Sequence, residues 1–96
     1  MEKLGQELID QRLEEYPNWS QTGDALQRTF SFDDFLGAMA FVNRIADLAE
    51  ESQHHPDIMI RYNKVTLTLS THDAGGVTER DFALARAADR TLGDAG

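Results

Sequence analysis

The stretch IMIRYNKVTLTLS, residues 58–70, decides the fold, because its apolar and polar residues alternate on either side of Asn63–Lys64. Alternation with a period of two is typical of a strand with one buried face, and two such runs separated by two turn residues indicate a β-hairpin. With Asn63–Lys64 as the turn, we expect Ile60 to lie opposite Leu67 on the apolar face.

The same register predicts that the three histidines of the chain converge. Extended past the strand ends, it places His55 opposite His72 and His54 opposite Asp73. Directly opposite residues of an antiparallel pair lie about 5 Å apart. Pro56 favours an extended conformation for His55, so His54 and His55 straddle a bend and both imidazoles can face one ligand.

Three imidazoles in one pocket suit general acid and base catalysis, because the imidazole ring gains and loses protons near neutral pH. The alternative is a set of solvated or hydrogen-bonded histidines at a strand end. A zinc site is disfavoured, because the adjacent His54 and His55 are awkward ligands for one ion and neither His-x-His nor His-x-x-x-His spacing occurs in the sequence. We therefore predict no bound metal.

Two carboxylates are candidates to support these histidines. Glu50 precedes His54 by four residues, one turn of a continuing helix, and can fix the tautomer of its imidazole. Otherwise Glu50 is a solvated side chain beside Glu51. Asp81 follows Thr78 by three residues, a pattern typical of a helix start. Its carboxylate can cap a free backbone N–H, support the site, or do both.

Outward from the hairpin, apolar residues at three- and four-residue intervals predict three helices. The first covers residues 2–15. The second runs from about 32 to 52 and starts at a capping pattern formed by Ser31 and Asp34. The third begins near residue 78 and stops near Gly93, because glycine commonly follows the last residue of a helix.

A further hairpin is predicted over residues 19–32, where alternation resumes around Gly23–Asp24. The element order is then α-β-β-α-β-β-α. Each helix has one apolar stripe and the strands have one apolar face. We therefore predict an α+β fold, in which a four-stranded antiparallel sheet carries three helices on one face.

The length and charge of the chain limit the classes of function that it can have. A chain of 96 residues has no room for a second core, so one domain is expected over residues 1–96. Seventeen acidic against nine basic residues give a net charge of -8, which argues against nucleic-acid and membrane binding. The absence of cysteine excludes disulfides and thiolate catalysis and fits a reducing compartment. Without a signal-peptide pattern or a long apolar run, we expect a soluble, cytoplasmic protein.

The stretch HHPDIMIRYNKVTLTLSTHDAGGVTERDFALA, residues 54–85, resembles the core of the pterin-4a-carbinolamine dehydratases. Residues 26–56, LQRTFSFDDFLGAMAFVNRIADLAEESQHHP, are similar to the same family, so the resemblance covers about residues 18–90. One departure is Asp57–Ile58, where animal members carry an aromatic residue after the acidic one. This departure concerns how one edge of the pterin is packed.

The resemblance implies an enzyme, a hydro-lyase that converts 4a-hydroxytetrahydropterin to quinonoid dihydropterin and water during tetrahydropterin recycling, with no metal or organic cofactor. It implies that His54 and His72 act as acid and base and that His55 binds and orients the pterin. The resemblance also implies which residues line the site, namely Gln53, Ser70, Thr71 and Asp73. It implies Glu50 and Asp81 as supporting carboxylates.

The resemblance also implies a homodimer joined through sheet edges, or a homotetramer in which two dimers meet through helices. The unpaired backbone groups of an open sheet edge support only the dimer. Two alternatives to the dehydratase stay open. One is a protein-interaction module, because animal members also act as dimerisation cofactors of a homeodomain transcription factor. The other is a related protein acting on another pterin. Three imidazoles in one pocket favour catalysis over a pure interaction role.

Overall fold

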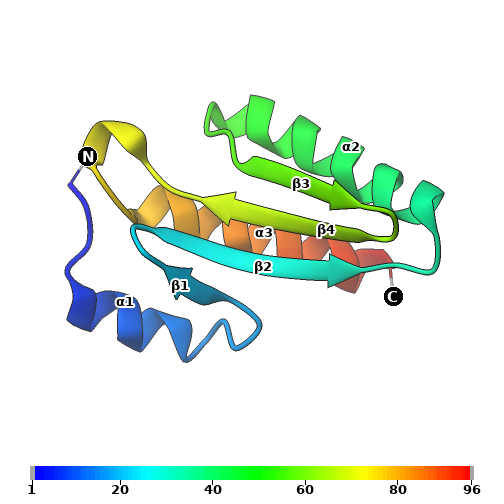
Figure 1. Ribbon diagram of the computed structural model, residues 1–96. Coiled ribbons are helices and arrows are strands. Elements are labelled where there is room, and N and C mark those ends of the chain that lie inside the picture. The colour runs from blue at the N-terminus through cyan, green and yellow to red at the C-terminus, as the bar shows by residue number, and fades with distance from the viewer. Residues whose placement is uncertain (1, 96) are drawn as a thin grey trace.

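The computed structural model describes residues 2–95 and has the predicted α+β architecture (Figure 1). A four-stranded antiparallel sheet has the strand order β1-β2-β4-β3, so the two hairpins join through β2 and β4. The elements in chain order are α1 (Gln6–Leu13), β1 (Ser20–Thr22), β2 (Ala25–Ser31), α2 (Phe35–Ser52), β3 (Asp57–Arg61), β4 (Lys64–Leu69), the 3₁₀ helix η1 (His72–Ala74) and α3 (Glu79–Ala95).

The core lies between one face of the sheet and the helices. Every second residue of β4 from Val65 to Leu69 is fully buried there, as are Leu26 and Phe30 of β2, with Leu26 paired to Leu69 and Phe30 paired to Val65. Phe30 packs against Phe41 of α2 with the two rings tilted and their centroids 4.5 Å apart. Burying one such side chain stabilises the fold by about 1.5–3 kcal/mol. The hydrophobic periodicity of the sequence therefore identified the faces that pack.

The helix α1 joins this layer through a contact with α3. Ile9 is buried in the same core, and the Arg12 guanidinium pairs with Glu79 at 2.7 Å. The hydrogen bond from Arg12 to Glu79 raises the pKa of the guanidinium above its ordinary value. The opposite face of the sheet has no helix on it in Figure 1, and its hydroxyls pair across the strands, as between Thr29 and Thr66 at 2.8 Å.

The first helix is shorter than the predicted range of 2–15. The Leu4 N–H donates to the Val77 carbonyl at 2.7 Å, so the residues before α1 follow the loop ahead of α3 instead of coiling. The prediction for the third helix was also wrong at its end. Gly93 lies within α3, since a glycine ends a helix only where the backbone turns left-handed and it otherwise continues the helix at a modest cost.

The start of the second helix differs from the prediction as well. Asp34 alone caps α2, and its carboxylate accepts the Gly37 N–H at 2.7 Å. Ser31 belongs to β2 and pairs with Lys64, so its predicted capping role was wrong. The predicted end of this helix at residue 52 is confirmed.

The register of the second hairpin is shifted by two residues from the prediction. Tyr62 and Asn63 form the turn, with Tyr62 in the left-handed region at φ 52°. Ile60 therefore pairs with Val65, not with Leu67. The turn is fixed from outside, because the Asn63 side chain donates to the Phe32 carbonyl at 2.8 Å. A shift of two residues keeps every side chain on its predicted face.

One polar network ties Trp19, the residue directly before β1, to β2 and α3. The carboxylate of Asp89 accepts hydrogen bonds from the Trp19 indole at 3.0 Å and from Arg28 at 2.6 Å. The Arg28 guanidinium also lies 4.3 Å from the centroid of the Phe30 ring. Both donors are at least partly shielded from water, so removing their acceptor leaves them unsatisfied.

We expect Asp89→Ala to lower the free energy of unfolding by about 1–3 kcal/mol, because two shielded donors lose their partner. Urea denaturation followed by circular dichroism measures this change. The matched control is Asp47→Ala, which removes an exposed carboxylate from α2. Equal stability of the two variants would contradict a structural role for the Asp89 network.

Candidate active site

The candidate site is built around the end of α2. The helix stops at Ser52, and Gln53 adopts a left-handed conformation with φ 54° and ψ 40°. The backbone N–H of His54 then turns back to the Ala49 carbonyl at 3.1 Å. This turn sends the side chains of His54 and His55 in different directions.

His54 points inward and is only 8% exposed. Its Nε2 lies 2.5 Å from Oδ1 of Asp81, which is fully buried. The other oxygen of Asp81 accepts the Thr78 N–H and the Thr71 hydroxyl, both at 2.9 Å. Asp81 therefore caps α3 and holds His54 at the same time, the double role that the sequence left open.

His55 points outward and pairs with Glu50, with Nε2 and Oε2 2.5 Å apart. Both side chains are exposed, at 58% and 73%. The prediction that Glu50 supports His54 was wrong. The helix ends before His54, so the four-residue spacing no longer places the two side chains on one face, and the turn at Gln53 brings His55 to Glu50 instead.

His72 reaches the site from the loop after β4. This loop is closed by a pair between Thr71 and Gly76, with the Thr71 N–H donating to the Gly76 carbonyl at 3.0 Å. Within it His72 starts the short helix η1, which ends at Gly75 in a left-handed conformation with φ 78°. His72 is thus presented by a compact loop and does not face His55 across a strand pair, as the predicted register required.

The three histidines nevertheless line one cleft. A cavity of about 270 Å³ is lined by Gln53, His54, His55, Ser70, Thr71, His72, Asp73 and Arg80. A neighbouring lobe of about 200 Å³ shares His55, Ser70 and His72 and adds Asp24, Ala25, Asp57 and Thr68. The structure therefore brings together all of the predicted site residues, with Glu50 and Asp81 behind the two histidines that they bind.

Sequence reasoning missed Arg80 and Asp24 in the wall of this cleft. Asp24 lies in the tight turn between β1 and β2, far from the histidines in sequence, and only the sheet order brings it near. The sequence contains one signal that could have identified Arg80. It is a cation in the first turn of a helix, where the helix dipole disfavours positive charge.

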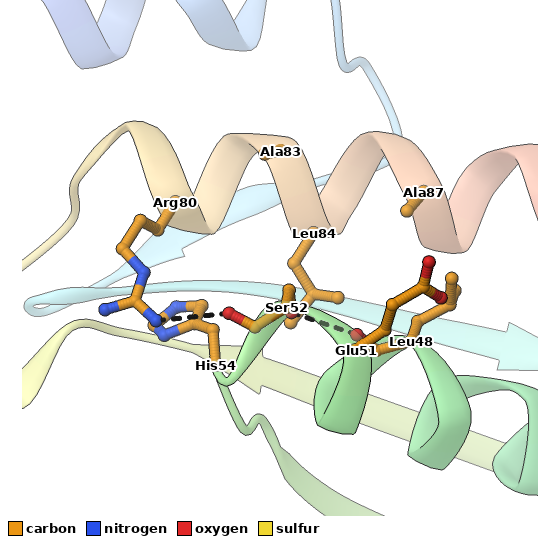
Figure 2. Close-up of a pocket in the computed structure, with 8 residues that line it drawn as sticks. All are labelled: Leu48, Glu51, Ser52, His54, Arg80, Ala83, Leu84 and Ala87. Carbon is orange, nitrogen blue, oxygen red and sulfur yellow. Dashed lines mark hydrogen bonds between the residues drawn. The ribbon is translucent and has the colours of Figure 1, made fainter.

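A larger groove of about 420 Å³ runs between α2 and α3 and meets the cleft at His54 and Arg80 (Figure 2). Its other lining residues include Leu48, Ala83 and Leu84, and Figure 2 shows Leu84 extending from α3 toward α2. Only one histidine borders this groove. We therefore place the chemistry in the smaller, three-histidine cleft.

His54 and His55 are each paired with a carboxylate, which suits them to proton transfer. A carboxylate bound to one ring nitrogen orients the ring and fixes which nitrogen carries the proton. Within residues 2–95, no three histidine, aspartate or glutamate side chains are arranged to hold one metal ion. In the same part of the chain, no helix has the length and apolar character needed to cross a membrane.

Comparison with known proteins gives a consistent result. The model of the family described as pterin 4 alpha carbinolamine dehydratase matches residues 2–91. A relative from Thermomicrobium roseum, whose name assigns it to these dehydratases, is 60% identical over 86 residues, which is 90% of this chain and 92% of the relative. A relative from Chloroflexus aurantiacus with the same assignment is 50% identical and covers 97% of this chain and 100% of its own length.

Solved structures agree in fold. A transcriptional coactivator/pterin dehydratase from Brucella melitensis superimposes with a TM-score of 0.88 at 34% identity, over 92% of this chain and 96% of that one. A pterin dehydratase-like protein, described as a RuBisCO assembly factor in the alpha-carboxysome, has a TM-score of 0.62 at 27% identity, over 75% and 83%. On the family match and the identities above, the chain belongs to the pterin-4a-carbinolamine dehydratase family.

Proposed function

We propose that this protein dehydrates 4a-hydroxytetrahydropterin in the three-histidine cleft, giving quinonoid dihydropterin and water. The observation that supports this proposal is the pairing of His54 with Asp81, at the wall of a cleft that His72 also lines. In the reaction the C4a hydroxyl leaves as water and a ring N–H loses its proton. One group must therefore give a proton to the leaving oxygen and another must accept one.

The geometry suggests how the two proton transfers are divided. An ionised carboxylate only accepts hydrogen bonds, so Nε2 of His54 carries a proton toward Asp81 and Nδ1 is free to accept one. We assign His54 as the base, with Asp81 stabilising the imidazolium that forms. His72, on its separate loop, is then the acid that protonates the leaving hydroxyl. For this step His72 enters as the imidazolium and becomes neutral, while His54 becomes the imidazolium, so the net charge of the protein is unchanged. A proton then returns from His54 to His72 through solvent.

The remaining cleft residues divide into substrate contacts and supports. His55 is at the exposed rim with Glu50, a position suited to binding and orienting the pterin. Asp73 is left as a further substrate contact. The Ser70 hydroxyl donates to the Asp24 carbonyl at 2.9 Å and can still accept a hydrogen bond from the substrate. The Thr71 hydroxyl is buried and donates to Asp81, and the Gln53 amide donates to the Glu50 carbonyl at 2.6 Å. These two residues therefore act mainly as supports.

An interaction role of the kind named for the Brucella protein is the alternative, as is action on another pterin. An interaction role does not explain a histidine buried against a fully buried carboxylate beside an open cleft. Dehydration therefore remains the better account of the site.

We expect His54→Ala and His72→Ala each to lower kcat by about 10²- to 10⁴-fold, the usual contribution of a positioned acid or base. His55→Ala should mainly raise KM, because it removes a binding contact. A stopped-flow assay of carbinolamine decay, corrected for the uncatalysed reaction, measures both constants. Asn43→Ala, an exposed change on α2, is the control. Full activity in all three histidine variants would refute the proposed chemistry.

We expect activity to survive prolonged chelation, because both proton transfers are assigned to imidazoles and neither step needs a Lewis acid. The measurement compares kcat before and after dialysis against a chelator. An enzyme that loses activity on dialysis and regains it with stoichiometric zinc would reverse this conclusion.

We also propose that the protein is a homo-oligomer joined through β3. This strand is at the edge of the sheet, with β4 as its one neighbour, so half of its backbone groups face outward. Ile58 and Ile60 on it are 36% and 37% exposed, although they share a face with the buried core. An unguarded apolar edge is a template for a second copy of the same strand. A tetramer, in which two such dimers meet through their helices, is the larger assembly that the family resemblance implies.

Light scattering on a size-exclusion column should give a mass of at least twice the 10.8 kDa of one chain. Ile58→Lys should shift the protein toward the monomer, because it places a charge at the edge. Leu8→Lys, a matched change at a residue 37% exposed on α1, should leave the mass unaltered. A wild-type mass of one chain would eliminate edge pairing.

A further inference from the structure

Arg80 reaches from the first turn of α3 across to the end of α2 (Figure 2). Its Nη2 donates to the Gln53 carbonyl at 2.6 Å and lies 3.5 Å from the Ser52 carbonyl. The same side chain lines both the histidine cleft and the α2–α3 groove, so it stands at the boundary between them. Within residues 2–95, Asp81 is the other side chain of α3 that binds this region, and it bonds to the imidazole of His54, whereas Arg80 bonds to the backbone carbonyls.

The charge of Arg80 fits the end of α2 and not the helix that carries it. The last turn of α2 contains no basic residue, although the carbonyls there carry partial negative charge. The first turn of α3, where Arg80 lies between Glu79 and Asp81, is a site where a cation is unfavourable. The positive charge of the guanidinium therefore offsets the partial negative charge at the end of α2. The stability of α3 does not explain why an arginine occupies this position.

The bond to the Gln53 carbonyl acts on the residue that orients the histidines. Gln53 is left-handed, a conformation that costs free energy for a residue other than glycine and that persists only where surrounding contacts hold it. The Gln53 carbonyl belongs to the peptide group that joins Gln53 to His54. A rotation of this peptide would move His54 away from Asp81 and His55 away from Glu50 together.

We propose that Arg80 is a positioning residue for both histidines, which holds the left-handed turn at Gln53 so that His54 stays aligned with Asp81. The inference rests on the proposed function for its kinetic consequence, but its structural part stands on these contacts alone. Arg80 acts through the Gln53 carbonyl, without transferring a proton itself.

The kinetic test compares Arg80→Ala and Arg80→Lys with wild type in the stopped-flow assay. We expect kcat to fall by about 10- to 100-fold in Arg80→Ala, because a small displacement of a reacting group costs up to about 10²-fold. KM should rise by a smaller factor than kcat falls, because the same turn also places His55. Arg80→Lys keeps the charge but lacks the planar fork, so an intermediate loss is expected. Millimolar guanidinium should restore part of the activity of Arg80→Ala. The control is Arg86→Ala, which removes an exposed arginine from the same helix.

The structural test uses no substrate. Long-range ¹H–¹⁵N NMR of the imidazoles reports which nitrogen of His54 carries the proton. We expect one fixed tautomer, protonated at Nε2, in wild type and Arg86→Ala, and a mixture in both Arg80 variants. Arg80→Lys serves this purpose if Arg80→Ala does not fold.

Two results would overturn the inference. One is a raised KM with unchanged kcat, which would make Arg80 a substrate contact. The other is an unaltered His54 tautomer in both Arg80 variants. If wild type itself has no dehydratase activity, the proposed function fails, and the NMR result still decides whether Arg80 positions His54.

Discussion

The buried carboxylate of Asp81 is the interaction on which the rest of the site depends. Burying an ionised group is costly unless hydrogen bonds replace its hydration, and Asp81 receives three, from Thr78, Thr71 and His54. These donors come from the start of α3, the end of β4 and the end of α2. One side chain thus joins the three segments that form the cleft. The same contacts that stabilise the fold therefore also orient the candidate base.

Much of the fold could be predicted from the sequence, because burial follows hydrophobic periodicity. The faces of β2, β4 and α2 were predictable for this reason, and so was the element order. The register of the second hairpin was not, because its turn places Tyr62 in a left-handed conformation that favours glycine or asparagine. The contact between Asn63 and Phe32 that stabilises the turn joins residues 31 positions apart. No local pattern reveals such a contact.

The candidate site was predictable as a set of residues but not as a set of pairs. Residue types suited to proton transfer could be recognised in the sequence, and the structure places them around one cleft. The pairing of Glu50 with His55 depends on where α2 ends, and that end is at Gln53 instead of a glycine. The contact of Arg80 with Gln53 depends on how α3 packs against α2. Tertiary packing determines both, which is why sequence periodicity could not supply them.

Adjacent residues of one type acquire different properties here because one backbone turn separates their environments. His54 is enclosed and bound to a carboxylate that has no contact with water, whereas His55 and Glu50 stay in solvent. The hydrogen bond between an imidazole and a carboxylate is electrostatic and weakens where water competes for it, so the buried pair is held more firmly than the exposed one. A firmly held ring suits a proton acceptor that must keep one geometry through the reaction. A solvated ring at the rim suits a ligand contact that must form and release. The turn at Gln53 therefore gives two adjacent histidines of the sequence two different environments in the cleft.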